Sequence, residues 1–251
     1  MRSSPGTSPS HPRVLHLFSG PYVTYGRRRV NVPEGSKRLL VFVALHRGRV
    51  ERRYAAGALW PSGDEERAVG NLRSALWRLR GAGIQLLSAD NRGLVMRDDV
   101  FVDVCVVSAW AARLIGGSAT CNDLGIIPWG ADALDLLPGW YDEWVLMERE
   151  RIRQRLLHAL EALSHELVKV RRCAEAVEAA MMAVSAEPLR ESAQRMLIEA
   201  HLAEGNWVEA RRSYQAYWDL LGQEFGTEPG PALAAIVPRP EVSLRYCLLG
   251  H

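Results

Sequence analysis

Residues 65–80 read EERAVGNLRSALWRLR, and this stretch decides the fold of the first half of the chain. Four apolar residues recur in it at the spacing of one helical face: Leu72, Ala75, Leu76 and Leu79. Asp64 is suited to cap the start of a helix, and Gly81 and Gly83 are suited to end it. The stretch therefore predicts an amphipathic helix with one apolar face.

The outer face of this predicted helix is basic. At about 100° per residue, the side opposite Leu76 gathers small, polar and cationic residues together with one tryptophan. Arginine can donate two bonds to guanine, asparagine can pair with adenine, and serine can bond either a base or a phosphate. The predicted base contacts are Arg67, Asn71, Ser74, Trp77 and Arg78. Trp77 leaves three possibilities open: a thymine methyl group, a sugar, or packing against a neighbouring hairpin.

The segments on either side of this helix predict a winged helix-turn-helix. Before it, the runs RVLHLF, YVTY and RRVNV predict three short antiparallel strands, and SKRLLVFVALHRG and VERRYAAGALWP predict two helices. After it, IQLLSA and LVMRDDVFVDV flank DNRG, which is typical of a β-hairpin turn. This order predicts an α+β winged-helix domain over residues 13–103.

Basic residues gather where the predicted helices begin and where the hairpin turns. Helix N-termini offer backbone N–H groups to phosphate, and long cationic stems on the flank of a helix can reach phosphates. The predicted phosphate contacts are Lys37, Arg49, Arg52, Arg53, Arg73 and Arg80, with Arg38 beside the first of them. The predicted wing contacts are Asn91, Arg92 and Arg97.

The charge of the chain is divided unevenly. Residues 1–103 hold 17 lysine and arginine residues against nine acidic ones, whereas residues 104–251 hold 14 against 20. A basic half often binds phosphate, although chance clustering or a solvated face would give the same count. Because four separate segments place cations on one predicted surface, double-stranded DNA is the favoured partner.

The second half predicts an all-α helical-repeat domain over residues 104–237. EAVEAAMMAV (175–184) and EARRSYQAYW (209–218) match at an offset of 34 residues, and Leu163 matches Leu197 at the same offset. A 34-residue helix–turn–helix period is that of tetratricopeptide repeats, although other helical hairpin arrays imitate it. Residues 1–12 are expected to be a disordered tail, 116–130 an irregular junction, and 238–251 a C-terminal tail.

Catalytic and metal chemistry find little support in the sequence. The four cysteines lie far apart, and the seven histidines show no metal-ligand spacing. Asp98, Asp99 and Asp103 could form a carboxylate cluster, but the first two are expected to be solvated and the third to mark a strand end. No cofactor, no metal and no enzyme activity are expected. The N-terminus lacks the apolar core of a signal peptide, and no apolar run approaches the roughly 18 residues of a membrane span, which predicts a cytoplasmic chain without membrane contact.

The same residues resemble a known family. Residues 36–80, with ALWP at 58–61 and the R-L-R at 78–80, look like the OmpR-type winged helix of the Streptomyces antibiotic regulatory protein family. LLPGWYDEWVLMERERIRQRLLHALEAL (136–163) and residues 188–233 resemble the bacterial transcriptional activation domain of those proteins, in a short stand-alone form. The resemblance covers about residues 14–235. It implies self-association on promoter direct repeats, recruitment of RNA polymerase, and control of antibiotic or other secondary-metabolite genes.

The expected function is that of a sequence-specific DNA-binding transcriptional regulator, and the resemblance implies an activator. The residues themselves do not distinguish activation from repression. The alternative is a helical-repeat scaffold that binds a protein partner and carries a degenerate DNA-binding domain. DNA binding that falls steeply with salt concentration would favour the first function.

Overall fold

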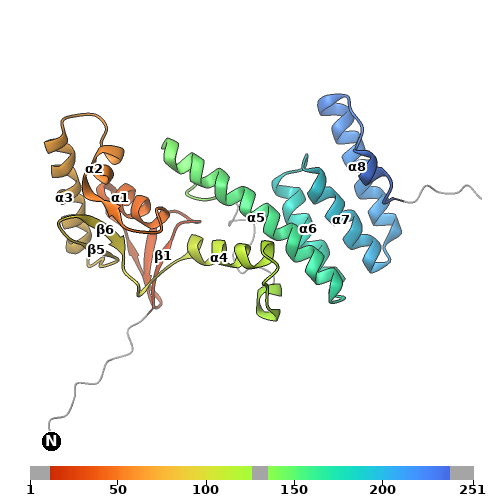
Figure 1. Cartoon of the computed structure of the whole chain (residues 1–251), viewed down its shortest axis with the longest axis horizontal. Coiled ribbons are helices and arrows are strands. Elements are labelled where there is room, and N and C mark those ends of the chain that lie inside the picture. Colours follow the sequence, from red (N-terminus) through yellow and green to blue (C-terminus); the bar gives the residue numbers. More distant parts are fainter. Residues whose placement is uncertain (1–11, 126–134, 238–251) are drawn as a thin grey trace, which may run out of the picture. The chain divides into compact units, whose positions relative to one another are not determined.

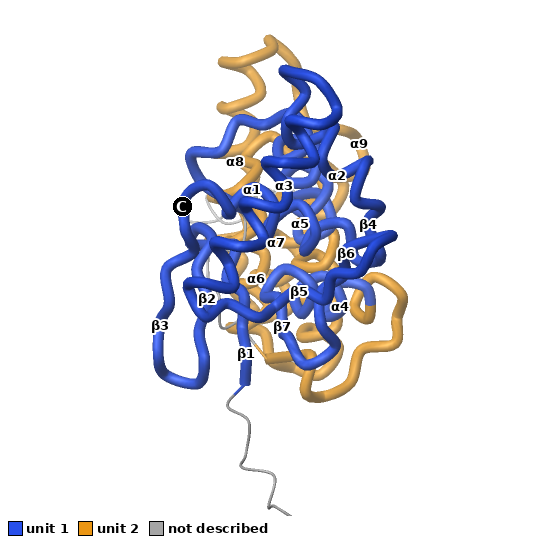
Figure 2. The backbone as a smooth tube through the Cα atoms, turned by 90° about the vertical axis from the view of Figure 1, so that its left-hand side faces the viewer, with its two compact units in different colours: residues 1–112, 129–156 blue, residues 113–128, 157–251 orange. Residues whose placement is uncertain are grey.

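A computed structural model describes residues 12–125 and 135–237, and these form two compact units (Figures 1 and 2). Unit 1 comprises residues 1–112 and 129–156, and unit 2 comprises residues 113–128 and 157–251. The two units alternate along the chain, so each contains segments from both halves of the sequence. The domain limits expected at residues 13–103 and 104–237 stay a prediction.

Unit 1 begins with the winged-helix elements, in the order expected from the sequence. Its first half consists of β1 (Arg13–His16), β2 (Tyr22–Tyr25), β3 (Arg28–Asn31), α1 (Glu34–Leu45), β4 (Val50–Glu51), α2 (Arg52–Leu59), α3 (Glu65–Gly81), β5 (Leu87–Ala89), β6 (Gly93–Met96) and β7 (Val100–Val102). The three N-terminal strands, the three helices and the hairpin of β5 and β6 agree with the sequence prediction.

The strands of unit 1 form two sheets, and one pairing differs from the expectation. The first sheet has the order β3-β2-β1-β7, and the second has the order β4-β6-β5. The sequence predicted that residues 94–104 continue the hairpin, but β7 leaves it and pairs in parallel with β1, with Leu15 opposite Val102. The turn at residues 97–99 redirects the chain, and Val50–Glu51 supplies the third strand of the hairpin sheet instead.

The three helices α1, α2 and α3 lie together in unit 1 (Figure 1). They contribute side chains to one apolar core. From α3, that core receives Ala68, Leu72, Ala75 and Leu76, and α1 contributes Leu39, Phe42 and Val43. Asp64 caps α3 as expected, because its carboxylate accepts a 2.7 Å hydrogen bond from the Arg67 backbone N–H. Ser36 of α1 adds a buried bond to the Ala75 carbonyl, at 2.9 Å. These contacts fix which face of α3 points outward.

Asp103 ties the ends of the two parallel strands together. It begins α4 (Asp103–Ile115) directly after β7, and it is buried. Its carboxylate accepts hydrogen bonds from the backbone N–H groups of Leu17 at 2.8 Å, Phe18 at 3.3 Å and Val104 at 2.7 Å. Burial raises the pKa of this carboxyl, while the three N–H donors oppose that rise. Asp103 therefore marks the strand end, as expected, and is the first residue of α4.

A segment from the second half of the chain completes unit 1. Leu137 donates its backbone N–H to the Leu17 carbonyl at 3.1 Å. At the start of α5 (Glu143–Lys169), Trp144 packs edge-on against Phe42 of α1 with ring centroids 5.2 Å apart. Asp142 forms an ion pair with Arg38. The sequence predicted Arg38 beside a phosphate contact, but its guanidinium bonds Asp142 and the Leu59 carbonyl within unit 1.

Unit 2 is helical throughout its described part. Its elements are the ends of α4 and α5, the 3₁₀ turn η1 (Cys121–Leu124), α6 (Cys173–Ala186), α7 (Glu191–Glu204), α8 (Trp207–Phe225) and α9 (Pro231–Ala234). Residues 126–134, the predicted C-terminal tail at 238–251, and all but the last residue of the predicted N-terminal tail at 1–12 lie outside the described residues. Within residues 12–125 and 135–237, no helix combines the length and apolar character that a membrane span requires.

The 34-residue repeat corresponds to two successive helix pairs. Ala176 of α6 and Ala210 of α8 are equivalent in the repeat, and both are fully buried. Leu163 of α5 and Leu197 of α7 are likewise equivalent and buried. Small residues at the first position let neighbouring helices approach closely, as the sequence predicted. The helical-repeat prediction is therefore confirmed for the described part of unit 2.

Candidate nucleic-acid interface

The side of α3 that faces away from the core carries most of the predicted base contacts. Arg67, Ser74, Trp77 and Arg78 are exposed, and 74% of the Trp77 surface is accessible to solvent. Asn71 is only half-buried and lies between the core and the outer face. The outward direction predicted for these residues thus holds for four of them and in part for Asn71.

Arg78 already makes one contact within unit 1. Its guanidinium donates a 3.2 Å hydrogen bond to the Gly35 carbonyl in the first turn of α1. This bond links α3 to the start of α1, where sequence reasoning placed a phosphate contact. Arg78 therefore has fewer free donors than Arg67, which makes no such side-chain contact in the described part of the chain.

Two arginines on the flanks of α3 are exposed and free of acidic partners. Arg73 and Arg80 are both exposed, and no carboxylate among the described residues lies within ion-pair distance of either. Arg73 lies four residues before Trp77, and Arg80 lies three residues after it, so both are neighbours of the indole on the helix surface. Their guanidinium groups are available to an external anion.

The other predicted phosphate contacts have partners within unit 1. Lys37 pairs with Glu34 at 2.5 Å, Arg53 pairs with Glu65 at 3.1 Å, and Arg49 pairs with Asp90. Such exposed pairs contribute little to stability, about 0–1 kcal/mol, because water and salt screen them. A phosphate can therefore displace the carboxylates, but these cations bind an external anion less strongly than free ones.

A groove brings several of these residues together. It lies between the start of α2, the first turns of α3 and the hairpin turn, and its lining residues are Arg52, Arg53, Glu65, Glu66, Val69, Arg73, Ala89, Asp90 and Asn91. Three predicted phosphate contacts and one predicted wing contact therefore share one surface. A second groove, between the end of α3 and the hairpin, has Arg80 and Arg97 among its lining residues. Lys37 lines neither groove.

Asp90 organises the hairpin turn, and sequence reasoning did not single it out. Its carboxylate accepts hydrogen bonds from the backbone N–H groups of Arg92 at 2.8 Å and Gly93 at 2.9 Å, in addition to the Arg49 guanidinium. Its own carbonyl accepts a 3.1 Å bond from Arg52. The signal was present in the DNRG turn, because aspartate at the first turn position bonds the backbone that follows. Asp90 thereby positions Arg49 and Arg52.

We expect the Asp90 carboxyl to titrate well below the ordinary aspartate range. The Arg49 guanidinium, followed by the N–H groups of Arg92 and Gly93, lowers its pKa. Because the pKa of this carboxyl is lower in the folded chain than in the unfolded one, the carboxylate stabilises the turn fully above the unfolded pKa, near 4. This stabilisation is lost as the pH falls from there through the folded pKa. NMR titration of the Asp90 carboxyl measures this value directly.

Arg49→Ala is the matched variant for this titration. It removes the guanidinium and keeps the two backbone donors, so the pKa of Asp90 should rise part of the way to its ordinary value. An unchanged pKa would show that Arg49 does not hold the turn.

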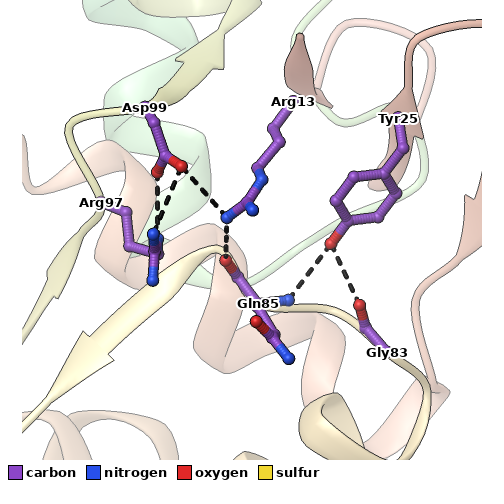
Figure 3. A network of polar contacts seen from close by, with 6 residues as sticks. All are labelled: Arg13, Tyr25, Gly83, Gln85, Arg97 and Asp99. Carbon is purple, nitrogen blue, oxygen red and sulfur yellow. Dashed lines mark hydrogen bonds and ion pairs between the residues drawn. The ribbon is translucent and has the colours of Figure 1, made fainter. Parts of the chain in front are cut away.

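A network of polar contacts anchors the end of α3 and the base of the hairpin to the first sheet (Figure 3). Asp99 pairs with Arg97 at 3.0 Å and with Arg13 at 3.1 Å, and Arg13 also bonds the Gln85 carbonyl. The Tyr25 hydroxyl donates to the Gly83 carbonyl and accepts from the Gln85 N–H, both at 3.2 Å. The network holds the exit of α3 in place.

This network also locates Arg97, which the sequence grouped with the wing. Arg97 follows the end of β6, on the far side of that strand from the turn at Asp90–Gly93. The adjacent Arg97 guanidinium lowers the pKa of Asp99. Asp99 is thus exposed, as expected, but it is engaged in ion pairs. Asn91 and Arg92 are exposed at the turn itself.

Gly70 has no packing reason to be glycine. It lies in the middle of α3, and an added Cβ would meet no heavy atom within 4 Å. Glycine in a helix interior costs about 0.5–1 kcal/mol relative to alanine. We therefore expect Gly70→Ala to raise the free energy of unfolding by about 0.5–1 kcal/mol in urea denaturation.

Gly93→Ala should act in the opposite direction. A Cβ at Gly93 would lie 2.9 Å from the Val50 carbonyl oxygen, so the hairpin sheet would have to shift. If both variants lowered stability equally, the open space at Gly70 would be contradicted.

Metal chemistry finds no support in the described residues. Within residues 12–125 and 135–237, no three side chains of histidine, cysteine, aspartate or glutamate lie where they could hold a metal ion. Cys105, Cys121 and Cys173 are free thiols. Burial raises the pKa of the Cys105 thiol, which makes it a poor nucleophile.

Comparisons with known proteins find a matching family model and a curated relative. A family model described as the bacterial transcriptional activator domain matches residues 109–238. The regulatory protein AfsR of Streptomyces griseus is 27% identical over 194 residues, which cover 72% of this chain and 19% of AfsR. The chain thus spans about a fifth of the length of this curated relative.

A solved structure shares the fold. Mycobacterium tuberculosis EmbR, solved in complex with a low-affinity phosphopeptide, superposes with a TM-score of 0.62. Its sequence identity is 18%, and the superposition covers 90% of this chain and 64% of the EmbR chain. At this identity the likeness establishes the fold alone. The α+β winged helix followed by helical repeats is therefore an architecture that occurs in another protein.

Proposed function

We propose, from the premise that this chain belongs to the bacterial transcriptional activator domain family and is of the Streptomyces antibiotic regulatory protein type, that it binds promoter DNA and activates transcription. The observation that carries the proposal is the outer face of α3, where Arg67, Arg73 and Arg80 are exposed without carboxylate partners among the described residues. In a winged helix-turn-helix, this helix enters the major groove.

The contacts divide into two kinds under this proposal. Arg73 and Arg80, on the flanks of α3, bind phosphates and fix the register of the protein on the duplex. Arg67 and Ser74 face the base edges, and Arg78 shares its donors between a base and the Gly35 carbonyl. The turn held by Asp90 presents Asn91 and Arg92 to the neighbouring minor groove or backbone.

The cations that form ion pairs within unit 1 contribute less to the binding of phosphates. Lys37, Arg49 and Arg53 must exchange a carboxylate for a phosphate when DNA binds. Arg52 is held by the neutral Asp90 carbonyl and keeps its full charge. We therefore rank Arg73 and Arg80 above Lys37, Arg49 and Arg53 as phosphate contacts, an order that sequence reasoning did not provide.

The helical repeats of unit 2 are proposed to mediate protein contacts. Two or more protomers would associate on direct repeats and recruit RNA polymerase, and the target genes would serve secondary metabolism. What supports this is the family membership together with the repeat of α5 to α8, whose outer surfaces include the exposed apolar residues Trp207, Val208 and Phe225. Those same residues favour the second candidate function, a scaffold for a protein partner.

The deciding experiment measures DNA binding and transcription with the full chain. Fluorescence anisotropy on DNA from upstream of candidate target genes should show binding that weakens steeply with salt and exceeds binding to a scrambled duplex. Transcription in vitro with RNA polymerase should rise on the bound promoter. Binding that is absent or insensitive to salt would overturn DNA recognition, and capture of a partner without any footprint would favour the scaffold.

A further inference from the structure

Trp77 is a large apolar side chain placed where water surrounds it. It lies on the outer face of α3 with 74% of its surface accessible. Within the described residues, the indole makes no aromatic contact and no hydrogen bond, and it does not belong to the apolar core of unit 1. The possibility that it packs against the hairpin is therefore excluded. Tryptophan is enriched at interfaces because it combines a large apolar ring with a polar N–H, and an exposed indole is therefore suited to contact another molecule.

Small residues lie along one side of Trp77 on α3, opposite the side that carries Arg73 and Arg80. Ser74 lies three residues before the indole and Gly81 four after it, and Gly70 lies two helical turns before it. A Cβ at Gly70 or Gly81 would meet no heavy atom within 4 Å, so neither glycine is required by packing. The indole consequently projects above a low surface, and it is the part of this stripe that reaches a partner first.

Two free cations flank the indole and indicate what this partner is. Arg73 and Arg80 lie about one helical turn on either side of Trp77, and both are exposed without a carboxylate partner in the described part of the chain. Both guanidinium groups lie along the same edge of the stripe that carries Trp77, one turn before it and one turn after it, and this favours a polyanion. Phosphates bound along that edge would place the apolar ring over the adjoining groove. The partner must then offer an apolar group beside a row of phosphates.

The major groove contains one such group. Guanine, cytosine and adenine present donors and acceptors along this groove, whereas thymine also presents its 5-methyl group. We propose that Trp77 contacts the 5-methyl group of a thymine, so that an A·T pair at this position determines which sites the protein binds. The inference rests on the proposed DNA-binding function and extends it to a specific chemical group of the bases.

Replacing thymine by uracil removes only the methyl group and therefore tests the contact directly. The full chain is first footprinted on a bound promoter, and each thymine of the protected site is then replaced by deoxyuridine in a separate duplex. Burying one methyl group corresponds to about a fourfold change in affinity. We expect the wild-type chain to lose about fourfold at one or two positions and to be unaffected at the others.

Trp77→Ala and Arg80→Gln separate the contact from general DNA binding. Trp77→Ala should bind the thymine and uracil duplexes equally well, at the sensitive positions as elsewhere. Arg80→Gln should bind all duplexes more weakly and keep the thymine preference. Because both side chains are exposed, neither substitution is expected to unfold the protein, which circular dichroism checks.

Two outcomes would overturn the inference while leaving DNA binding intact. In the first, the wild-type chain binds every uracil duplex as tightly as the parent duplex. In the second, Trp77→Ala keeps the full preference for thymine, which would assign the methyl contact to another residue. Absence of binding to any duplex would instead contradict the proposed function itself, so the two failures are distinguishable.

Discussion

Replacing Asp103 with alanine is expected to lower the free energy of unfolding of unit 1 by about 3 kcal/mol. The buried carboxylate accepts hydrogen bonds from three backbone N–H groups, those of Leu17, Phe18 and Val104. A hydrogen bond to a charged acceptor contributes about 1.5–3 kcal/mol, and a buried donor left without a partner costs about 1–3 kcal/mol. Part of this total is offset because alanine removes the desolvation cost of the carboxylate.

Asp98→Ala is the matched control for this variant. Asp98 lies five residues earlier and is exposed, so its removal should change stability by no more than about 0.5 kcal/mol. Urea denaturation gives the overall difference, and amide hydrogen exchange at Leu17, Phe18 and Val104 reports the local opening. Equal midpoints for the two variants would contradict the role of Asp103 at the strand ends.

Replacing both Arg73 and Arg80 with glutamine is expected to weaken DNA binding about 30-fold at 0.15 M salt. Each phosphate contact releases about 0.9 counterions, so two contacts supply roughly this factor at that concentration. The slope of log affinity against log salt should also become shallower by about 2. Both arginines are exposed and lack acidic partners in the described part of the chain, so no other interaction complicates the comparison.

Arg171→Gln/Arg211→Gln matches this variant in charge. These two arginines are also exposed, but they belong to unit 2, so the slope should stay unchanged. Fluorescence anisotropy at several salt concentrations measures affinity and slope together. If both double variants changed the slope equally, net charge rather than the surface of α3 would govern binding.

The paired cations should behave differently from the free ones. Arg53 is paired with Glu65, so Arg53→Gln has two effects. It removes a phosphate contact, and it leaves the Glu65 carboxylate without this partner, where it repels the phosphates of DNA. The change that Arg53→Gln causes in the slope of log affinity against log salt therefore reflects both the lost guanidinium and the unpaired carboxylate, whereas a substitution of Arg73 reflects the lost guanidinium alone. This distinction comes from the pairing seen in unit 1, and the count of arginines in the sequence does not contain it.

Local features of the fold were predictable because they depend on residues close in sequence. The apolar stripe of α3, its cap at Asp64 and the DNRG turn each need fewer than twenty residues to recognise. The 34-residue repeat was equally accessible, since Ala176 and Ala210 occupy equivalent buried positions and differ only by one period. In each case, side-chain spacing alone specifies which face is buried.

Pairings between distant segments were not predictable from spacing. Val100–Val102 is as compatible with the hairpin as with the sheet of β1, and only the turn at residues 97–99 decides between them. The packing of Trp144 on Phe42 joins residues about a hundred positions apart. The same limit applied to the candidate interface, where sequence placed Arg53 and Arg49 but not their partners in other elements, Glu65 and Asp90.

The contribution of residues 129–156 to unit 1 has a consequence for how this protein can be divided. A fragment that ends near residue 112 would lack Asp142 and Trp144, so Arg38 would lose its carboxylate partner and the Phe42 ring its edge-on contact with the indole. We therefore expect the winged helix to be less stable in such a fragment than in the full chain. A gene fusion that kept all of these contacts would have to carry both segments of unit 1, which favours inheritance of the two halves of the chain together.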